Sequence, residues 1–434
     1  MRSTDPHPQK WETIPLRYVC ELNPSVAFDG FDEDEDLTFL PMDRVKSGYF
    51  ISNTDKFSKY GSSYTAFEEG DIVLAKVTPC FENGNIAIVG DLVGGKGFGS
   101  SELFVIRPTA AERRFLFYYF QSSIFKQDGE ASMTGAGGLK RVSPDVLRQH
   151  HLPCPSQDIQ RLIANYLDLE TARIDGLIAE KECMLTLLEE KRAALISRAV
   201  TRGLDPSTPL KLSGQEELGE IPAHWEVRRI KFVTAWLDQG SSPTAANSPA
   251  GPGELGVLKL SAVSKGRFNR EENKALRRLD DEEQLLALRR GDVLITRGNT
   301  PELVADVACV LEDEPYLLLP DLIYRLRVKK EEVLPEYLTF FLTTAAARVQ
   351  IRRDARGSSG SMVKVSQGHV LDWMAPLPPL SEQTEIVHYL RRAEDRSQLT
   401  MKEVSSSLSL LSERRAAVIT AAVTGQIPLE EMTR

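Results

Sequence analysis

The sequence has few cysteines and no arrangement of them that suggests a bridge or a metal site. Among 434 residues there are five, Cys20, Cys80, Cys154, Cys183 and Cys309, with no Cys-x-x-Cys pair, which favours reduced thiols. The chain also lacks an apolar run of the ~18–20 residues that a membrane span needs, and its first residues lack the apolar stretch of a signal peptide. We therefore expect a cytoplasmic protein with no membrane association.

The common catalytic motifs are absent as well. The glycine-rich stretch 94–100 lacks the Walker spacing, and there is no Gly-x-Ser-x-Gly elbow, His-Glu-x-x-His helix or Asn/Asp-Pro-Pro-aromatic tetrapeptide. Two Gly-Asp pairs, Gly70-Asp71 and Gly291-Asp292, recur at matched positions. Each precedes a β-rich run, where Gly-Asp is a routine turn into a strand. The sequence thus predicts a recognition protein without catalytic residues or a metal of its own.

Basic residues are outnumbered by acidic ones, 53 against 62. The net charge of −9 argues mildly against binding nucleic acid by bulk attraction, although a local basic face remains compatible with it. Acidic residues gather at 29–36, which we interpret as a solvated loop. Basic residues gather at 289–290, 297, 325–330 and 348–356.

The most informative feature present is an internal repeat. The block 188–196 returns as 411–419, a shift of 411 − 188 = 223 positions. The same shift aligns 153–201 with 376–424, and matches at smaller shifts continue upstream to Trp11 and Trp225. These matches describe two diverged copies, 11–201 and 225–424. A unit of this length is a domain with its helix, and is too long for a solenoid repeat of ~20–50 residues.

Each copy begins with short β-rich runs and ends in one long amphipathic helix. We expect an α+β domain at 1–155, a long helix at 156–202, a linker at 203–222, a second domain at 223–379, a long helix at 380–425 and a tail at 426–434. Each domain should contain one further helix, at 115–126 and at 335–353. Proline clusters precede both long helices, because proline cannot continue a helix, and Ser381 is placed as the second N-cap.

The apolar stripe of each long helix has two interpretations. It could pack on its own domain, or the two helices could pair with each other. We favour pairing, because a helix of about forty residues would be ~60 Å long, well beyond a domain of this size. Ala194 and Ala417 occupy matched positions where the helices should abut. The residues expected in helix pairing and subunit docking are Gln160, Ile163, Leu167, Leu188, Ala194, Leu195, Gln383, Ile386, Leu390, Leu411, Ala417 and Val418.

Several segments together resemble the specificity subunit of type I restriction-modification enzymes. The entry to copy two, 219–227, is similar to that family's lead into a target recognition domain, with a reduced form at 10–12. The stretch 377–386 resembles its proline turn into a helix, and the repeated blocks at 188–196 and 411–419 resemble its helix ends. Copy one keeps Gln160 but lacks the preceding glutamate.

The resemblance implies two target recognition domains held by an antiparallel pair of long helices. Each domain would read one half of a bipartite duplex DNA target, and the helices would set the spacer. Two modification subunits would dock, carrying S-adenosylmethionine, and restriction subunits with ATP and Mg²⁺ would join them; this chain would hold no cofactor. Such copies can present equivalent faces to two half-sites.

DNA reading needs side chains with fixed donors and acceptors on loops that reach a groove, and cations for the phosphates. The sequence offers such residues in three loops that recur in both copies. The candidates are Lys46, Ser47, Tyr49, Lys76, Thr78, Asn83, Asn85, Lys140 and Arg141 in copy one, and Lys265, Arg267, Arg297, Asn299, Thr300, Ser359, Ser361 and Lys364 in copy two.

Two other functions fit parts of the sequence. One is a duplicated scaffold that binds a protein or carbohydrate and uses its helices only to dimerise. The other is a stand-alone nuclease with an atypical site. Binding of duplex DNA in the presence of a methyltransferase partner separates the first from a specificity subunit, and DNA cleavage by the chain alone with Mg²⁺ would support the second.

Overall fold

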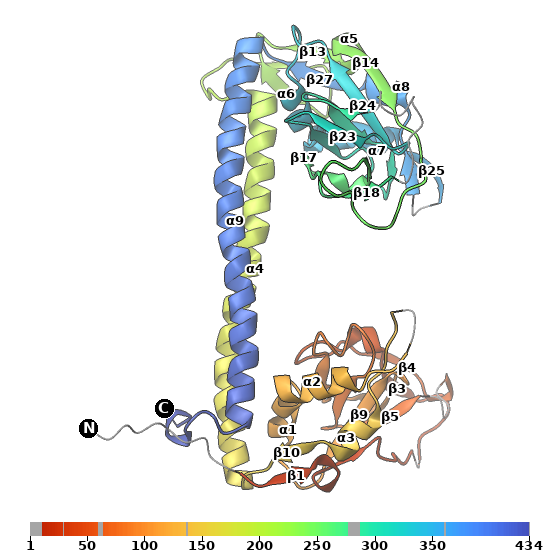
Figure 1. The fold of residues 1–434 in the computed structure, drawn as a ribbon, viewed down its shortest axis with the longest axis vertical. Helices are drawn as coiled ribbons and strands as arrows, with labels where there is room; N and C mark the ends of the chain where they lie inside the picture. Colours follow the sequence, from red (N-terminus) through yellow and green to blue (C-terminus); the bar gives the residue numbers. More distant parts are fainter. Residues whose placement is uncertain are drawn as a thin grey trace, which may run out of the picture. The chain divides into compact units, whose positions relative to one another are not determined.

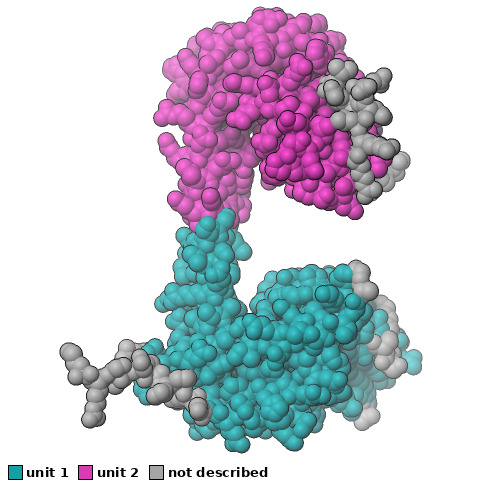
Figure 2. All heavy atoms as spheres, in the orientation of Figure 1, with its two compact units in different colours: residues 1–183, 405–434 teal, residues 184–404 magenta. Residues whose placement is uncertain are grey.

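The structure is organised as two compact units. The computed structural model describes residues 11–28, 30–59, 64–135, 138–276, 287–359 and 362–433. Unit 1 comprises residues 1–183 and 405–434, and unit 2 comprises residues 184–404 (Figure 2). Each unit contains one α+β domain and part of both long helices, α4 (Gln157–Arg202) and α9 (Leu380–Val423) (Figure 1). No helix in the described part of the chain is long and apolar enough to cross a membrane.

Domain 1 of unit 1 runs from β1 to β10. Its elements are β1 (Thr13–Pro15), β2 (Cys20–Leu22), β3 (Asp36–Leu40), β4 (Asn53–Lys56), β5 (Thr65–Glu68), β6 (Ile72–Ala75), β7 (Ile86–Ile88), β8 (Lys96–Gly99), β9 (Leu103–Pro108), α1 (Arg113–Tyr119), α2 (Ser123–Ala131), α3 (Pro144–Gln149) and β10 (His151–Pro153). One sheet has the order β2-β9-β6-β7 and a second has the order β4-β3-β8-β5. Strand β1 pairs antiparallel with β10, directly before α4.

Domain 2 of unit 2 runs from β13 to β27 and repeats this plan, after a hairpin of β11 (Leu210–Leu212) and β12 (Glu220–Pro222). Its elements are β13 (Glu226–Arg229), α5 (Ile230–Val233), β14 (Thr234–Gln239), β15 (Gly256–Leu258), β16 (Val263–Ser264), β17 (Arg267–Phe268), β18 (Asn273–Ala275), β19 (Ala287–Leu288), β20 (Val293–Thr296), β21 (Gly298–Asn299), β22 (Val307–Cys309), β23 (Glu314–Leu318), β24 (Ile323–Val328), α6 (Pro335–Leu342), α7 (Ala345–Asp354), β25 (Arg356–Ser359), β26 (Met362–Lys364), α8 (Gln367–Asp372) and β27 (Met374–Leu377). Its sheets β14-β24-β20-β22 and β18-β15-β23-β19 correspond to those of domain 1.

The central strands explain why each domain is layered. All four residues of β6 are buried, and alternate residues of a strand face opposite sides of its sheet. Ile72 and Leu74 pack with the helices, whereas Val73 and Ala75 pack toward the second sheet. Strand β20 divides in the same way, with Val293 and Ile295 in one core and Leu294 in the other. The central sheet is therefore a middle layer, and its runs are apolar throughout because both faces are covered.

A buried glutamine ties the start of each long helix to its domain. In unit 2 the side-chain oxygen of Gln383 accepts the backbone N–H of Leu334 at 2.8 Å, and its amide nitrogen donates to the carbonyls of Pro378 at 2.9 Å and Glu332 at 3.1 Å. In unit 1 Gln160 makes the matching bonds to Glu112 at 2.7 Å and Pro155 at 2.8 Å. These backbone groups at a helix start would otherwise be unpaired.

The motif around Glu382 differs between the copies for a structural reason. Glu382 accepts hydrogen bonds from the Trp225 indole at 3.0 Å and pairs with His224 at 2.8 Å, so it holds the entry to domain 2 against α9. Ile159 stands at the matching position of α4 and packs, with Trp11, against the core of unit 1. In unit 1 an apolar side chain therefore stands where unit 2 has the Glu382 carboxylate.

Each domain core also buries the end of the other long helix. Ile196, Ala199 and Val200 of α4 belong to the core of unit 2, which includes Ile386 and Leu390 at the start of α9. The residues at +223, Ile419, Ala422 and Val423, lie in the core of unit 1. This core includes Ile163 and Leu167 at the start of α4. The helices therefore run antiparallel within each unit, and the α+β fold with a helix pair and an internal repeat is confirmed.

Ion pairs join the helices in both units. Arg415 donates to Asp175 at 2.8 Å in unit 1, and Arg192, at the matching repeat position, donates to Glu394 at 2.9 Å in unit 2. The expectation for the alanines was wrong. Ala194 and Ala417 are exposed, so they do not pack between the paired helices. Leu188, Leu195, Leu411 and Val418 are half-buried.

Three local expectations also need correction. The single helix expected in each domain is broken, because Ser122 and Thr344 accept backbone N–H groups as N-caps and start α2 and α7. The expected linker holds the hairpin β11–β12. Ser381 lies inside α9, which begins at Leu380, so it is not the N-cap.

We predict that Gln383→Leu destabilises unit 2 by about 2–4 kcal/mol, because it leaves buried backbone donors and acceptors unpaired. Gln398→Leu, at an exposed position of the same helix, is the control and should change stability by less than about 0.5 kcal/mol. Thermal unfolding with hydrogen exchange localises the loss. Equal losses of stability from the two substitutions would contradict the role given to the Gln383 hydrogen bonds.

Candidate nucleic-acid interface

In both domains the loop after the central strand lies beside the segment that precedes the proline turn. In domain 1 the N–H of Val142 donates to Lys76 at 2.8 Å, and that of Thr78 donates to Lys140 at 3.0 Å. In domain 2 the N–H of Val365 donates to Arg297 at 2.9 Å, and β21 pairs with β26. The structure therefore brings together candidate residues from two distant parts of each copy.

The basic side chains of this surface in domain 1 differ in whether they already interact with another described residue. Arg141 donates to both carboxylate oxygens of Glu102, at 2.9 and 2.8 Å, and these bonds lower the pKa of Glu102. Lys76 lies over the Phe104 ring, 5.5 Å from its centre. Lys140 is exposed, and its Nζ makes no hydrogen bond or ion pair with a described residue. Lys140 is thus available to a phosphate.

The other domain 1 candidates on these loops are Thr78, Asn83 and Asn85. Thr78 bridges the two segments, since its hydroxyl accepts from the N–H of Lys140 at 2.8 Å and donates to Gly138 at 3.0 Å. Asn83 is exposed and Asn85 is half-buried. The carbonyl of Asn85 accepts from Ala75, next to Lys76, at 3.0 Å. Both asparagines therefore lie on the loop that continues this surface.

In domain 2 the corresponding surface centres on Arg297 and Lys364. Arg297 is half-buried, and its guanidinium makes no hydrogen bond or ion pair with the residues that the structure describes. Lys364 is exposed, and Gly298 lies opposite it in the β21–β26 pair. The Asn299 side chain accepts from the N–H of Thr300 at 2.9 Å. Ser359 ends β25, and Ser361 lies outside the described residues.

The backbone register determines which basic residues correspond between the two copies. Val142 matches Val365 at the shift of 223, so Lys364 corresponds to Arg141 and not to Lys140. A slip of one residue along a strand moves a side chain to the other face. The two lysines are therefore not equivalent positions, although each is exposed.

Sequence patterns did not single out the residue that holds the loop after Thr300. Arg348 of α7 donates to the carbonyls of Val304 at 2.6 Å and Glu302 at 2.8 Å. Burial lowers the pKa of this guanidinium. Arg348 is part of the basic run 348–356, but its burial, which sequence does not reveal, assigns it to positioning this loop.

The third pair of candidate turns lies beside the strands β7 and β22. Gly48 donates to Ile86, and Gly266 donates to Val307, each at 2.8 Å. Ser47 and Tyr49 are exposed, and Lys46 bonds the carbonyl of Asp43 at 2.7 Å. These positions remain predictions.

Arg267 is not placed as a base-reading residue should be. It is half-buried, and its Nε and Nη2 are buried without a hydrogen-bond partner among the described residues. It lines a cavity of about 680 Å³ together with Arg391 and Glu394 of α9. The neighbouring Lys265 is exposed, with its N–H bonded to Asp306 at 2.8 Å and its carbonyl to Arg192 at 3.0 Å. The turn at 264–267 is therefore anchored to α4.

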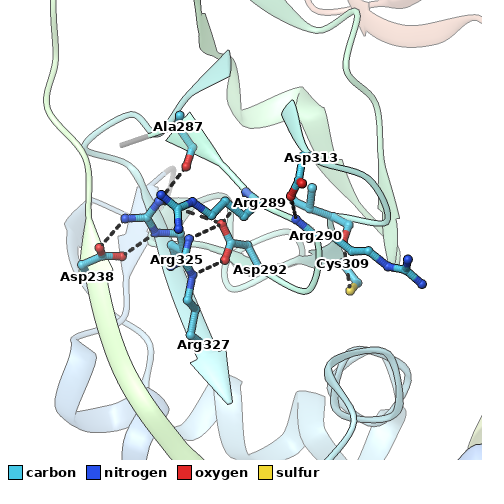
Figure 3. A network of polar contacts seen from close by, with 10 residues as sticks. Asp238, Ala287, Arg289, Arg290, Asp292, Cys309, Asp313, Arg325 and Arg327 are labelled. Carbon is cyan, nitrogen blue, oxygen red and sulfur yellow. Dashed lines mark hydrogen bonds and ion pairs between the residues drawn. The ribbon is translucent and has the colours of Figure 1, made fainter. Parts of the chain in front are cut away.

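The arginines of strand β24 are already paired inside the domain. Arg325 is buried and donates to both carboxylate oxygens of Asp238, at 3.0 and 2.6 Å (Figure 3). Arg327 donates to Asp292, which is 1% exposed and also accepts the N–H of Arg289 at 2.9 Å. The basic run 325–330 is thus not a wholly free phosphate-binding face.

The repeated Gly-Asp pairs have the structural role expected for them. Asp71 accepts two bonds of 2.8 Å from Arg107, as Asp292 accepts from Arg327. Gly70 and Gly291 each have a φ of +89°, which a residue with a side chain rarely adopts. Each pair is a turn into the central strand that is fixed by an arginine of the adjacent strand.

Among the described residues, no group of three or more His, Cys, Asp or Glu side chains could hold a metal ion. Cys20 and Cys309 are buried, and burial raises the pKa of each thiol to about 12. These two thiols are therefore protonated at neutral pH and unsuited to nucleophilic attack.

Comparison with known proteins agrees with this architecture. The family model described as "Type I restriction modification DNA specificity domain" matches residues 8–180. The EcoKI specificity subunit of Escherichia coli K12 is 24% identical over 97% of this chain and 90% of its own length. The EcoEI specificity subunit of E. coli is 24% identical over 88% of this chain and 77% of its own length. The first part of the chain therefore matches the DNA specificity domain, and most of the chain is similar to specificity subunits of type I restriction enzymes.

Two further matches describe the extent of the likeness. The E. coli EcoAI specificity subunit is 34% identical over 42% of this chain and 33% of its own length. A chain from a solved structure on "complex assembly and conformational transition of the type I R-M system" matches with a TM-score of 0.69 and 16% identity, over 97% of this chain and 99% of its own. The latter shows a shared fold.

We predict that Asp292→Asn destabilises domain 2 by about 2–4 kcal/mol, because the neighbouring arginines lose a carboxylate in a buried setting. Asp313→Asn is the matched control, since Asp313 is exposed and accepts only the N–H of Arg290 among the bonds identified in the described chain. Thermal unfolding of both variants decides the matter. A loss with Asp313→Asn as large as with Asp292→Asn would refute the role given to the ion pairs.

Proposed function

We propose that this chain is the DNA-reading subunit of a type I restriction-modification complex, and that each domain reads one half of a bipartite duplex target. The observation that carries this is the loop surface held by the same backbone bonds in both domains. Its side chains differ, with Lys76 and Thr78 in domain 1 against Arg297 and Asn299 in domain 2. Equivalent surfaces with different donors and acceptors suit two half-sites of different sequence.

The charges of these surfaces divide naturally into two roles. Lys140 and Lys364 are exposed cations, which suits contacts to phosphates. Within the described part of the chain the planar guanidinium of Arg297 has no hydrogen-bond or ion-pair partner, and it lies on a braced loop, which suits a paired contact to guanine. The net charge of −9 is tolerable if partner subunits supply much of the phosphate-neutralising surface.

The chemistry belongs to partner subunits in this proposal. Two modification subunits dock on the helix pair, one for each copy of the repeat, and carry S-adenosylmethionine. Restriction subunits with ATP and Mg²⁺ complete the complex. The repeat supports this stoichiometry, because the helix start and helix end are joined to a domain in the same way in each unit. The chain itself supplies recognition and assembly.

We predict that Lys364→Ala and Lys140→Ala weaken binding of the assembled complex to cognate and unrelated duplexes about equally, and reduce the salt slope by about one unit each. Arg297→Ala should instead relax one position of one half-site by ~1–3 kcal/mol. Titrations at several salt concentrations and methylation mapping give both readouts. Lys274→Ala, an exposed lysine of β18, is the control.

The opposite assignments would overturn these roles. If Lys364→Ala changed the preference for one base, Lys364 would read a base. If Arg297→Ala weakened binding to all duplexes equally, Arg297 would contact a phosphate. No binding of duplex DNA by the complex would favour the duplicated scaffold.

The helix pair is proposed to set the number of unread base pairs. Inserted residues must avoid the end of α4, because Ala199 and Val200 are buried in the core of unit 2. Seven residues inserted after Cys183 in α4, and seven after Val404 in α9, should lengthen the helices by ~10.5 Å. The spacer should then grow by about three base pairs, with both half-sites unchanged.

Methylation mapping with the modification partner measures this spacer. Insertion into α4 alone is the control, because it lets only one unit keep its helix contacts and should impair the complex. If the number of unread base pairs stays the same after the double insertion, the helices do not set the spacer and have only a structural role.

A further inference from the structure

The residues after α9 fold back onto unit 1. Ile427 and Leu429 pack against its core, and Met432 is 5% exposed. Figure 1 shows this tail beside the end of α9 and the start of α4. Burial and the carboxylates of Glu170 and Glu431 raise the pKa of Tyr166, which Arg414 opposes. Glu431 of the tail and Arg414 of α9 therefore each lie within electrostatic range of Tyr166 of α4.

The same helix surface in unit 2 is open. At the shift of 223, Tyr166, Arg414 and Val418 correspond to Tyr389, Lys191 and Leu195. All three of these residues line a hollow of about 780 Å³ between the two helices of unit 2. Tyr389 is 43% exposed.

The chain explains why the hollow is open. After Gly425 the tail continues along unit 1, but the matching segment after Gly203 forms the hairpin β11–β12. It places Leu218 and Ile221 in the core of unit 2 with Trp225. The segment that could have covered the hollow is therefore committed elsewhere.

The hollow has a defined chemistry. Leu188, Leu195 and Leu390 give it an apolar lining. Lys191, Arg392 and Arg396 contribute cations, whereas the acids in the lining are Glu385 and Glu394, and Glu394 is already paired with Arg192. The hydroxyl of Ser397 is buried without a hydrogen-bond partner among the described residues. In unit 1 the matching residue is the apolar Ile174.

We propose that the hollow between α4 and α9 in unit 2 is a docking site for a short apolar and acidic segment of a partner protein. The tail in unit 1 shows the chemistry that such a site takes, namely aliphatic side chains followed by carboxylates and a methionine. The excess of cations complements that charge, and the Ser397 hydroxyl offers a hydrogen bond. The inference rests on the proposed function in that a subunit of the complex supplies the segment.

The probe is a synthetic peptide with the sequence of residues 425–434, titrated into the full chain by calorimetry. We expect one peptide bound per full chain, and two bound per chain truncated after Gly425, because removing the tail opens the matching surface of unit 1. A peptide with Glu430→Gln and Glu431→Gln should bind at least tenfold more weakly.

Substitutions place the site. Lys191→Glu and Leu195→Asp should each weaken binding at least tenfold in the full chain. Ala193→Asp is the matched control, since Ala193 is exposed on the same helix and is not among the residues lining the hollow. Arg414→Glu, the counterpart in unit 1, should leave binding to the full chain unchanged. Unfolding curves confirm that each variant is folded.

No binding to the full chain, or binding that ignores Lys191→Glu, overturns the proposal. Self-association of the full chain that disappears on truncation after Gly425 identifies the tail of a second copy as the occupant and overturns the partner-protein assignment. Because the titration contains no DNA, peptide binding combined with failure of DNA binding would refute the proposed function and leave the docking site standing.

Discussion

The burial of two helix ends in each domain core is the constraint on which the rest of this structure depends. Each domain covers the start of the helix that follows it and the end of the other helix, through Ile386 with Val200 in unit 2 and Ile163 with Val423 in unit 1. The apolar stripe of each long helix therefore packs against a domain along part of its length and against the other long helix along another part. The two interpretations of the stripes, packing on a domain and pairing of helices, are both correct, at different stretches of the same helices.

This constraint also explains how the two copies can diverge. The bonds of Gln160 and Gln383 join side chains to backbone groups, so they tolerate changes in the surrounding residues. The interhelical arginine is kept as Arg192 and Arg415, but its acidic partner moves by one helical turn, from Glu394 to Asp175, where the direct match of Glu394 would be Thr171. A flexible guanidinium can reach either turn, so the pairing survives without identical sequences.

The loop surfaces follow the same principle. Backbone hydrogen bonds between the loop after the central strand and the segment before the proline turn set the frame, whereas the side chains on that frame differ between copies. The loop side chains can therefore change while the cores, the Gly-Asp turns and the bonds of Gln160 and Gln383 stay as they are. The unequal covering of the two helix grooves, by the tail in unit 1 alone, shows that the repeat is less symmetric at its edges than in its cores.

By itself the sequence determined the repeat, the α+β class, the two long helices and the apolar strands, because periodicity and proline positions are local signals that burial on one or two faces imposes. The tertiary structure alone decided which charged residues are free. Arg325 and Arg267 look as available as Lys364 in the sequence, yet the first is paired with Asp238 and the second faces a cavity beside α9. It also decided that Ala194 is exposed and that Lys364 matches Arg141. Ion pairs, the side to which a side chain points and the register between segments all depend on residues far apart in the chain. Composition and spacing along the sequence therefore do not predict them.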